Sequence, residues 1–259
     1  MALIFGLSEW QQYQQQFAGA PIILCFGDSW FQYPFPASGN LCNRFLAYGH
    51  QVVDIVSIGE LGMEIGKPGK SNLSHLLTFM QWESKQVDML IISGGGNDFA
   101  GADDLRPLLK HGVANDISSW FKAGETAALF GLIKRGYENI VHLRDQLCPD
   151  IPILTHCYDY PEVNGKGLLW FSPWIQPALI DVGMPAALHQ EAGRYIIDRL
   201  ADVQLALAGK HPHYEFIDTR HTLAKADWAN ELHPNNAGFD KMAAKFYPSL
   251  KQHFPEWIS

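Results

Sequence analysis

Four positions of the chain carry groups that together can perform nucleophilic chemistry, and the first of them is Ser29. It follows an apolar run at residues 22–26 and the pair Gly27-Asp28. A short apolar run of this kind predicts a strand that is buried on both faces. Ser29 then stands at the carboxyl end of the strand, where open parallel sheets bind their ligands. A hydroxyl there is a nucleophile when a base takes its proton and N–H groups stabilise the negative charge that develops.

Donors for that charge follow the next two predicted strands, at residues 51–57 and 89–92. Gly62 lies in a glycine-marked loop, and because glycine has no Cβ its backbone N–H can approach a substrate closely. Asn97 follows a triple glycine, and its carboxamide offers two further N–H donors. If the strands are neighbours, we expect the Ser29 N–H, the Gly62 N–H and the Asn97 side chain to form an oxyanion hole.

The candidate base is His233, one of eleven histidines. It lies in the segment Asn-Glu-Leu-His-Pro at residues 230–234, before a helix predicted near residues 239–250. Pro234 keeps the helix from extending backwards over His233, so the imidazole is held in a loop. Alone, this loop is more typical of a surface histidine in a turn before a helix.

Taken together, these positions resemble the GDSL/SGNH hydrolase family, whose four blocks contribute Ser, Gly, Asn and His in this order. The matching segments are Gly27-Asp28-Ser29, Gly62, Gly96-Asn97-Asp98 and His233-Pro234. The resemblance implies a three-layer α/β/α sandwich of flavodoxin-like type with a five-stranded parallel sheet. It also implies ester hydrolysis through an acyl-serine intermediate, with Ser29 and His233 as catalytic residues and no cofactor or metal.

The chain departs from the family at residue 230, where the family usually has an aspartate three residues before the histidine. Asn230 can accept a hydrogen bond from the imidazole and orient it, but gives the imidazolium no negative charge. We place Asn230 first as the orienting residue, and Asp227 and Glu231 remain alternatives in the same loop. The departure also supports a second hypothesis, a weakly active or inactive module of the same fold that binds a carbohydrate or an acyl ligand.

The elements that position these residues alternate between strand and helix. Two further strands are predicted at residues 151–155 and 214–217, and amphipathic helices at residues 7–17, 41–49, 73–82, 127–147 and 188–207. Such alternation predicts an α/β fold with a parallel sheet that is covered on both faces. We expect a single domain over residues 1–259, with an irregular, aromatic-rich insertion at about 160–185.

Composition narrows the classes of partner and location. A formal net charge of −8 without a cluster of Lys and Arg argues against nucleic-acid binding. The resemblance implies a small-molecule ester as the partner. No apolar run approaches the ~20 residues of a membrane span, and residues 1–20 do not resemble a signal peptide. We therefore expect a soluble cytoplasmic protein, while export without a cleavable signal stays open. Four scattered cysteines are interpreted as mostly buried thiols, with a disulfide as an alternative; the oligomeric state is not predicted.

Other motifs receive simpler interpretations. Residues 64–71 end like a phosphate-binding loop, but Glu64 stands where that motif needs its first glycine, so a polar surface loop is favoured. His211 and His213 could bind a metal ion, but no further ligand completes a recognisable site, so a surface turn is favoured. Structural hydrogen bonding is favoured over substrate contact for the polar residues after the fourth strand, which are His156, Tyr158 and Asp159. Aromatic residues near Ser29 and in the insertion form either core or the wall of an acyl or aryl pocket; they are Trp30, Phe31, Tyr33, Phe35, Trp170, Phe171 and Trp174.

Overall fold

The parallel sheet is the centre of the fold. The computed structural model describes residues 3–5, 12, 21–31, 39–48, 51–54, 63–67, 73–83, 87–168 and 173–257. In this part of the chain the sheet has six strands in the order β1-β3-β2-β4-β5-β6, and all neighbours are parallel. The strands are β1 (Leu3–Phe5), β2 (Ile22–Gly27), β3 (Gln51–Asp54), β4 (Met89–Ser93), β5 (Ile153–His156) and β6 (Tyr214–Ile217).

The predicted parallel α/β sheet is confirmed, but the predicted number of five strands is wrong. β1 pairs with β3, with Leu3 opposite Val52, and adds a strand at the edge of the sheet. Three residues are too few to show a period of two, so the sequence pattern does not reveal this strand. The other five strands have the doubly wound order 2-1-3-4-5 when they are numbered along the chain. The helix predicted at residues 7–17 lies outside the described residues, apart from Gln12.

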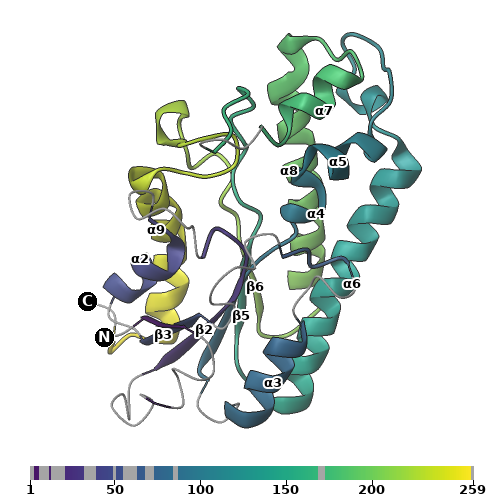
Figure 1. Ribbon diagram of the computed structural model, residues 1–259. Helices are drawn as coiled ribbons and strands as arrows, with labels where there is room; N and C mark the ends of the chain where they lie inside the picture. Colours follow the sequence, from purple (N-terminus) through teal and green to yellow (C-terminus); the bar gives the residue numbers. More distant parts are fainter. Residues whose placement is uncertain are drawn as a thin grey trace.

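Helices cover both faces of the sheet and give three layers (Figure 1). α2 (Leu41–Ala47) and α9 (Asn236–His253) contact each other on one face. On the other face, α6 (Ala123–Leu147) contacts both α3 (Leu73–Glu83) and α8 (Ala186–Ala208). The short helices are α4 (Asn97–Ala100), α5 (Ala102–Leu105) and α7 (Gln176–Asp181), with 3-10 turns at Arg106–Leu108, Ile117–Trp120 and Lys225–Asp227. The segment 160–185, predicted to be irregular, thus contains helix α7.

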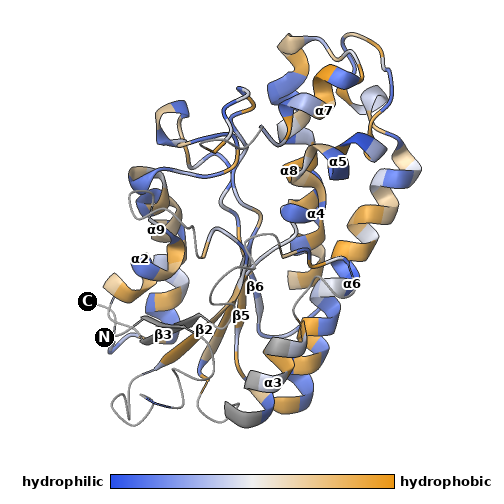
Figure 2. Cartoon of the chain, viewed as in Figure 1, coloured by the Kyte–Doolittle hydropathy of each residue, from blue (hydrophilic) through white to orange (hydrophobic). Residues whose placement is uncertain are grey.

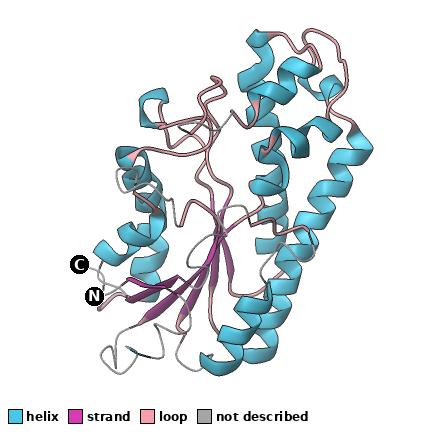
Figure 3. Ribbon diagram, in the orientation of Figure 1, coloured by secondary structure: helices cyan, strands magenta, loops and turns pink. Residues whose placement is uncertain are grey.

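The central strands are mostly hydrophobic, because helices cover both faces of the sheet (Figure 2). Every residue of β2, β4 and β5 is buried. Full burial of each such aliphatic side chain stabilises the fold by roughly 1.5–3 kcal/mol. This core fixes the strand ends, and loops gather beyond their carboxyl ends (Figure 3). Gly27 at the end of β2 lies opposite Ser93 at the end of β4, so the residues that follow both strands start side by side.

Phe246 joins the α9 layer to the sheet, and its loss should destabilise the protein. Its fully buried ring lies 5.2 Å from the Phe45 ring of α2 and 5.7 Å from the His156 ring of β5, between centroids. Phe246→Ala should lower the free energy of unfolding by about 3–5 kcal/mol, because it leaves a cavity in the core. Urea denaturation measures the change. The exposed neighbour Lys245 is the control, since Lys245→Ala should change stability by less than about 0.5 kcal/mol.

Membrane and cysteine features complete the description. Among the described helices, none is long and apolar enough to cross a lipid bilayer. No disulfide joins the four cysteines, Cys25, Cys42, Cys148 and Cys157, and of these four Cys148 alone is not fully buried. The cysteines therefore contribute to this fold by packing and not by cross-linking.

Candidate active site

Ser29 lies in a tight turn at the carboxyl end of β2. The Asp28 N–H donates to the Ser93 carbonyl (3.1 Å), which continues the β2–β4 ladder by one residue, and the Phe31 N–H donates back to the Asp28 carbonyl (3.0 Å). Gly27 is required here, because a Cβ would lie 2.5 Å from the Phe31 ring and 2.7 Å from the Ser93 carbonyl oxygen. The turn thus presents Ser29 above the sheet, with only 9% of its surface exposed.

His233 reaches Ser29 from the far end of the chain. The distance from Ser29 Oγ to His233 Nε2 is 2.8 Å. A small antiparallel bridge between Trp228 and Pro234 closes the loop that holds the imidazole, and Asn235 then caps α9 by accepting from the Gly238 N–H (3.0 Å). The loop ends where α9 begins, as the position of Pro234 predicts.

Asn230 fixes the orientation and the tautomer of His233. Its Oδ1 accepts the backbone N–H groups of Leu232 (3.0 Å) and His233 (2.9 Å), which sets which end of the carboxamide faces the ring. The same oxygen lies 3.2 Å from His233 Nδ1. Because this oxygen can only accept, Nδ1 carries the hydrogen and Nε2 offers its lone pair to the Ser29 hydroxyl.

The two acidic alternatives to Asn230 have other partners. Asp227 forms an ion pair with Lys241 (2.6 Å) and accepts the N–H of Ala224 (2.7 Å). Glu231 is fully buried and accepts four backbone N–H groups of the segment 165–176, at 2.7–3.3 Å. Asn230 is therefore the one of the three whose side chain lies at the imidazole.

Burial controls the protonation of His233. The side chain is only 6% exposed, and desolvation lowers its pKa to about 3. Removal from water disfavours the charged imidazolium, and the carboxamide at Nδ1 supplies no compensating negative charge. His233 is therefore neutral at physiological pH, which is the form that can accept a proton.

Two of the three residues predicted to supply oxyanion donors, Ser29 and Asn97, lie in the described part of the chain. Asn97 is the first residue of α4, and its Nδ2 donates to the Met63 carbonyl (3.2 Å), which orients the carboxamide. Ser29 and Asn97 line the same cavity as His233. Gly62, the third predicted donor, lies outside the described residues.

Asp98 anchors the segment that follows position 62, a role that the sequence did not reveal. Its carboxylate accepts the N–H of Ile65 (2.9 Å) and of Gly66 (2.7 Å). Burial raises the pKa of Asp98 to about 7. Because Asn97 is its direct neighbour, one short helix both carries the candidate donor and binds the backbone of residues 65 and 66.

A second unpredicted network joins the ends of three strands below Ser29. The Tyr158 hydroxyl donates to Asp28 Oδ2 (2.5 Å) and accepts the Gly96 N–H (3.2 Å), while the Ser93 hydroxyl donates to Asp28 Oδ1 (3.0 Å). Tyr158 has a φ of 65°, which is unusual for a bulky residue and is held in place by these bonds. Burial raises the pKa of Asp28 to about 6.

The neighbours of Tyr158 have structural bonds, as the sequence interpretation favoured. His156 is fully buried, its Nδ1 accepts the Tyr158 N–H (3.1 Å), and desolvation lowers its pKa to about 3. Asp159 accepts the N–H groups of the turn at residues 221–223 (2.6–2.9 Å). Tyr158 and Asp159 both border the cavity beside Ser29, whereas His156 packs beneath Trp30.

The aromatic candidates divide between core and cavity. Phe31 packs on Phe45 in the core, whereas Trp30 and Trp174 line the cavity at Ser29, and Trp174 lies edge-on to His233 with centroids 5.7 Å apart. The other aromatic candidates, Tyr33, Phe35, Trp170 and Phe171, lie outside the described residues. Within the described ranges, no three His, Cys, Asp or Glu side chains gather as metal ligands.

A family model and several solved structures are similar to this chain. The model of the GDSL-like lipase/acylhydrolase family matches residues 25–241, while a comparison with curated proteins finds no match. A family 3 carbohydrate esterase of Clostridium thermocellum has a similar structure at 13% identity, with a TM-score of 0.51 and coverage of 92% of this chain and 98% of that one. A lipase from a goat rumen metagenome is 13% identical, with a TM-score of 0.51 and coverage of 88% and 97%. These likenesses show the fold, and the family match extends from the strand before Ser29 into the last helix: the chain belongs to the GDSL-like lipase/acylhydrolase family.

Proposed function

We propose that this protein is a serine hydrolase that cleaves carboxylic esters through an acyl-serine intermediate. The observation that carries the proposal is the distance of 2.8 Å between Ser29 Oγ and His233 Nε2, two residues 204 positions apart in the sequence. A nucleophile within hydrogen-bond reach of a base, with a third group orienting the base, is the arrangement that covalent acyl transfer needs. We also interpret residues 1–259 as a single domain built around this site.

In the first half of the proposed reaction, Ser29 Oγ bonds to the ester carbonyl carbon while its proton passes to His233 Nε2. The negative charge moves to the carbonyl oxygen, which faces the Ser29 N–H and the Asn97 carboxamide, with Gly62 as the proposed third donor. The tetrahedral intermediate then releases the alcohol, which takes the proton from His233. Asn230 Oδ1 accepts from the imidazole Nδ1–H throughout.

In the second half, water attacks the acyl-serine and gives a proton to His233. Collapse of the second tetrahedral intermediate breaks the bond to Ser29 Oγ, which recovers that proton, and the carboxylic acid leaves. The direct test is turnover of p-nitrophenyl butyrate and its loss after treatment with a fluorophosphonate. Turnover no faster than in buffer would overturn the proposal, and ligand binding without turnover would favour the alternative, a binding module.

Asn97→Ala should lower kcat for p-nitrophenyl butyrate by about 10²–10³, because one oxyanion donor is lost. Since that donor acts mainly in the transition state, KM should change little. The measurement is steady-state kinetics at neutral pH. The control is Asn43→Ala: Asn43 is an exposed residue of α2 whose backbone N–H makes the N-terminal cap, so removal of its side chain should leave kcat unchanged.

A further inference from the structure

The cavity beside Ser29 has a composition that selects among esters. It has a volume of about 310 Å³ and is bordered by the candidate catalytic residues and by apolar side chains. We propose that this site, if it is the esterase described above, prefers esters whose acyl group is uncharged and hydrophobic, with up to about eight carbon atoms. The proposal rests on the serine hydrolase function and adds the substrate class.

The proposed reaction places the alcohol and the acyl chain of the ester on different sides of the cavity. The oxygen of the departing alcohol must face His233, because His233 returns the proton to it, so the alcohol belongs beside Trp174 and Leu232 on that side. The carbonyl oxygen must face Asn97. The acyl chain is therefore directed towards the remaining wall, called the acyl wall below. Helix α4, the segment after β5 and helix α8 supply it through Phe99, Ala100, Pro161 and Ile197.

In the described part of the chain, the acyl wall has no Lys or Arg and no unbonded polar side chain to bind a charged or hydroxylated acyl chain. Among the described residues that line the cavity there is no Lys or Arg. The polar side chains beside the wall already have partners: Tyr158 bonds to Asp28, and Asp159 accepts the N–H groups of Tyr160 and of the turn at residues 221–223. An acyl carboxylate placed here would lose its hydration without gaining a partner.

The size of the cavity sets the length of the chain. An apolar protein cavity of about 150 Å³ holds one benzene molecule, so a cavity of about 310 Å³ has space for roughly twelve non-hydrogen atoms. The ester group and the first atoms of the alcohol take about four of these places, which leaves space for an acyl chain of about eight carbon atoms. An acetyl group would leave most of that space unfilled. We therefore expect medium-chain acyl groups to gain the most from burial.

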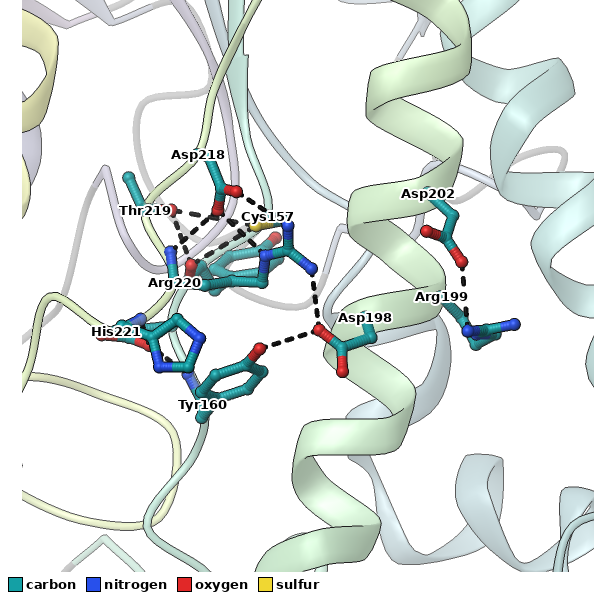
Figure 4. Close-up of polar contacts among 11 residues, drawn as sticks. Cys157, Tyr160, Asp198, Arg199, Asp202, Asp218, Thr219, Arg220 and His221 are labelled. Atoms are coloured by element: carbon teal, nitrogen blue, oxygen red, sulfur yellow. Dashed lines mark hydrogen bonds and ion pairs between the residues drawn. The ribbon is translucent and has the colours of Figure 1, made fainter. Parts of the chain in front are cut away.

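Polar contacts link Tyr160, which precedes Pro161, and Arg220 to helix α8 (Figure 4). The Tyr160 hydroxyl donates to Asp198 of α8 (2.8 Å), and Arg220 forms ion pairs with Asp198 (2.8 Å) and Asp218 (2.7 Å). These bonds fasten the segments that follow β5 and β6 to helix α8. Pro161 is thereby pressed against Gly193 of α8, where a Cβ would lie only 2.9 Å from the proline ring.

Glu231 fixes the wall of the cavity that contains Trp174 and Ile175. Its two oxygens accept four backbone N–H groups, including those of Trp174 (2.7 Å) and Ile175 (2.9 Å), and both of these residues line the cavity. Glu231 lies between Asn230 and His233 in the sequence, so the loop that carries the base also positions this wall. A cavity with both walls fixed can discriminate by shape.

The test is a series of p-nitrophenyl esters from acetate to decanoate. We expect kcat/KM to rise by up to about fourfold for each methylene and by at least 100-fold from acetate to octanoate. The monoester of adipic acid should be at least tenfold slower than hexanoate. A flat series, or one that is fastest for acetate, would overturn the proposal. A second series varies the alcohol of acetate esters. If kcat/KM rose with the length of the alcohol while it stayed flat across the acyl series, the proposal would also be overturned.

Substitutions at Ile197 locate the effect in the cavity. Ile197→Trp should lower the ratio of kcat/KM for octanoate to kcat/KM for acetate by at least tenfold, whereas Ile197→Ala should move the optimum to longer chains. The matched control is Ile196→Ala on the same helix, a buried residue that does not line the cavity. Circular dichroism checks that each variant is folded. If neither Ile197 variant changes the chain-length profile, the acyl wall is wrongly assigned.

Failure of this proposal can be distinguished from failure of the proposed function. A small fluorophosphonate reports the reactivity of Ser29 whatever acyl chain the cavity prefers. Labelled Ser29 with acetate as the best substrate would reject the acyl preference and leave the serine hydrolase intact. An unlabelled, folded protein that cleaves no ester would reject both.

Discussion

Ser29→Ala should lower kcat for p-nitrophenyl butyrate by about 10⁴–10⁶, because no acyl-serine can form without the hydroxyl oxygen. Activity that remains should come from the oxyanion donors and the cavity acting on water alone. The measurement is steady-state turnover with a background correction for spontaneous hydrolysis. The fold should survive, since Ser29 lies at the end of β2 and its hydroxyl bonds to His233 and not to the sheet.

A matched control separates the nucleophile from the turn that carries it. Ser93→Ala removes a hydroxyl of the same size that donates to Asp28 at 3.0 Å, on the strand beside β2. It should change kcat far less than Ser29→Ala does. Equal activity of Ser29→Ala and the wild type would contradict the proposed mechanism.

Asn230→Leu should lower kcat by about 10³–10⁴, because His233 Nδ1 loses the acceptor that holds its hydrogen. Nε2 then carries the hydrogen in part of the molecules and cannot take the proton of Ser29. The measurement is kcat at neutral pH. The substitution also removes the acceptor of two backbone N–H groups, so thermal unfolding of the variant must be measured alongside activity.

Asn230→Asp should keep the geometry and change the pH profile. A carboxylate at Nδ1 favours the imidazolium, so it raises the pKa of His233 from about 3, and the base form is then lost at a higher pH as the solution is acidified. The acidic limb of kcat/KM should move up by at least one pH unit. Above that limb kcat should rise by about fivefold to tenfold, because a charge-assisted bond stabilises the imidazolium better. Protonation of Asp28 and Asp98 affects both proteins, so the difference between the two profiles belongs to residue 230.

The parts of this molecule that were predictable have a local signal in the sequence. β2 and β4 are unbroken apolar runs, and each ends in residues that favour a turn, so the positions of Ser29 and Asn97 follow from the strands themselves. His233 was identifiable because Pro234 separates it from the last helix. The choice of Asn230 over Asp227 and Glu231 was not settled by the sequence, since side-chain direction within one loop has no period.

The parts that were not predictable depend on contacts between distant segments. The bond from Tyr158 to Asp28 joins residues 130 apart, and the Asp98 carboxylate reaches back to Ile65 over 33 positions. Glu231 organises a segment more than fifty residues earlier. β1 was missed for another reason, because three residues are enough to pair with β3 but too few to show a pattern.

The most direct measurement of the central claim is the site of covalent modification by a fluorophosphonate. The wild-type protein should gain one adduct, and peptide mass spectrometry should place it on Ser29; His233→Ala should slow the labelling by at least 100-fold, because the hydroxyl then lacks its base. If the folded wild-type protein takes up no adduct, or takes it up at a residue other than Ser29, the proposed nucleophile is wrong.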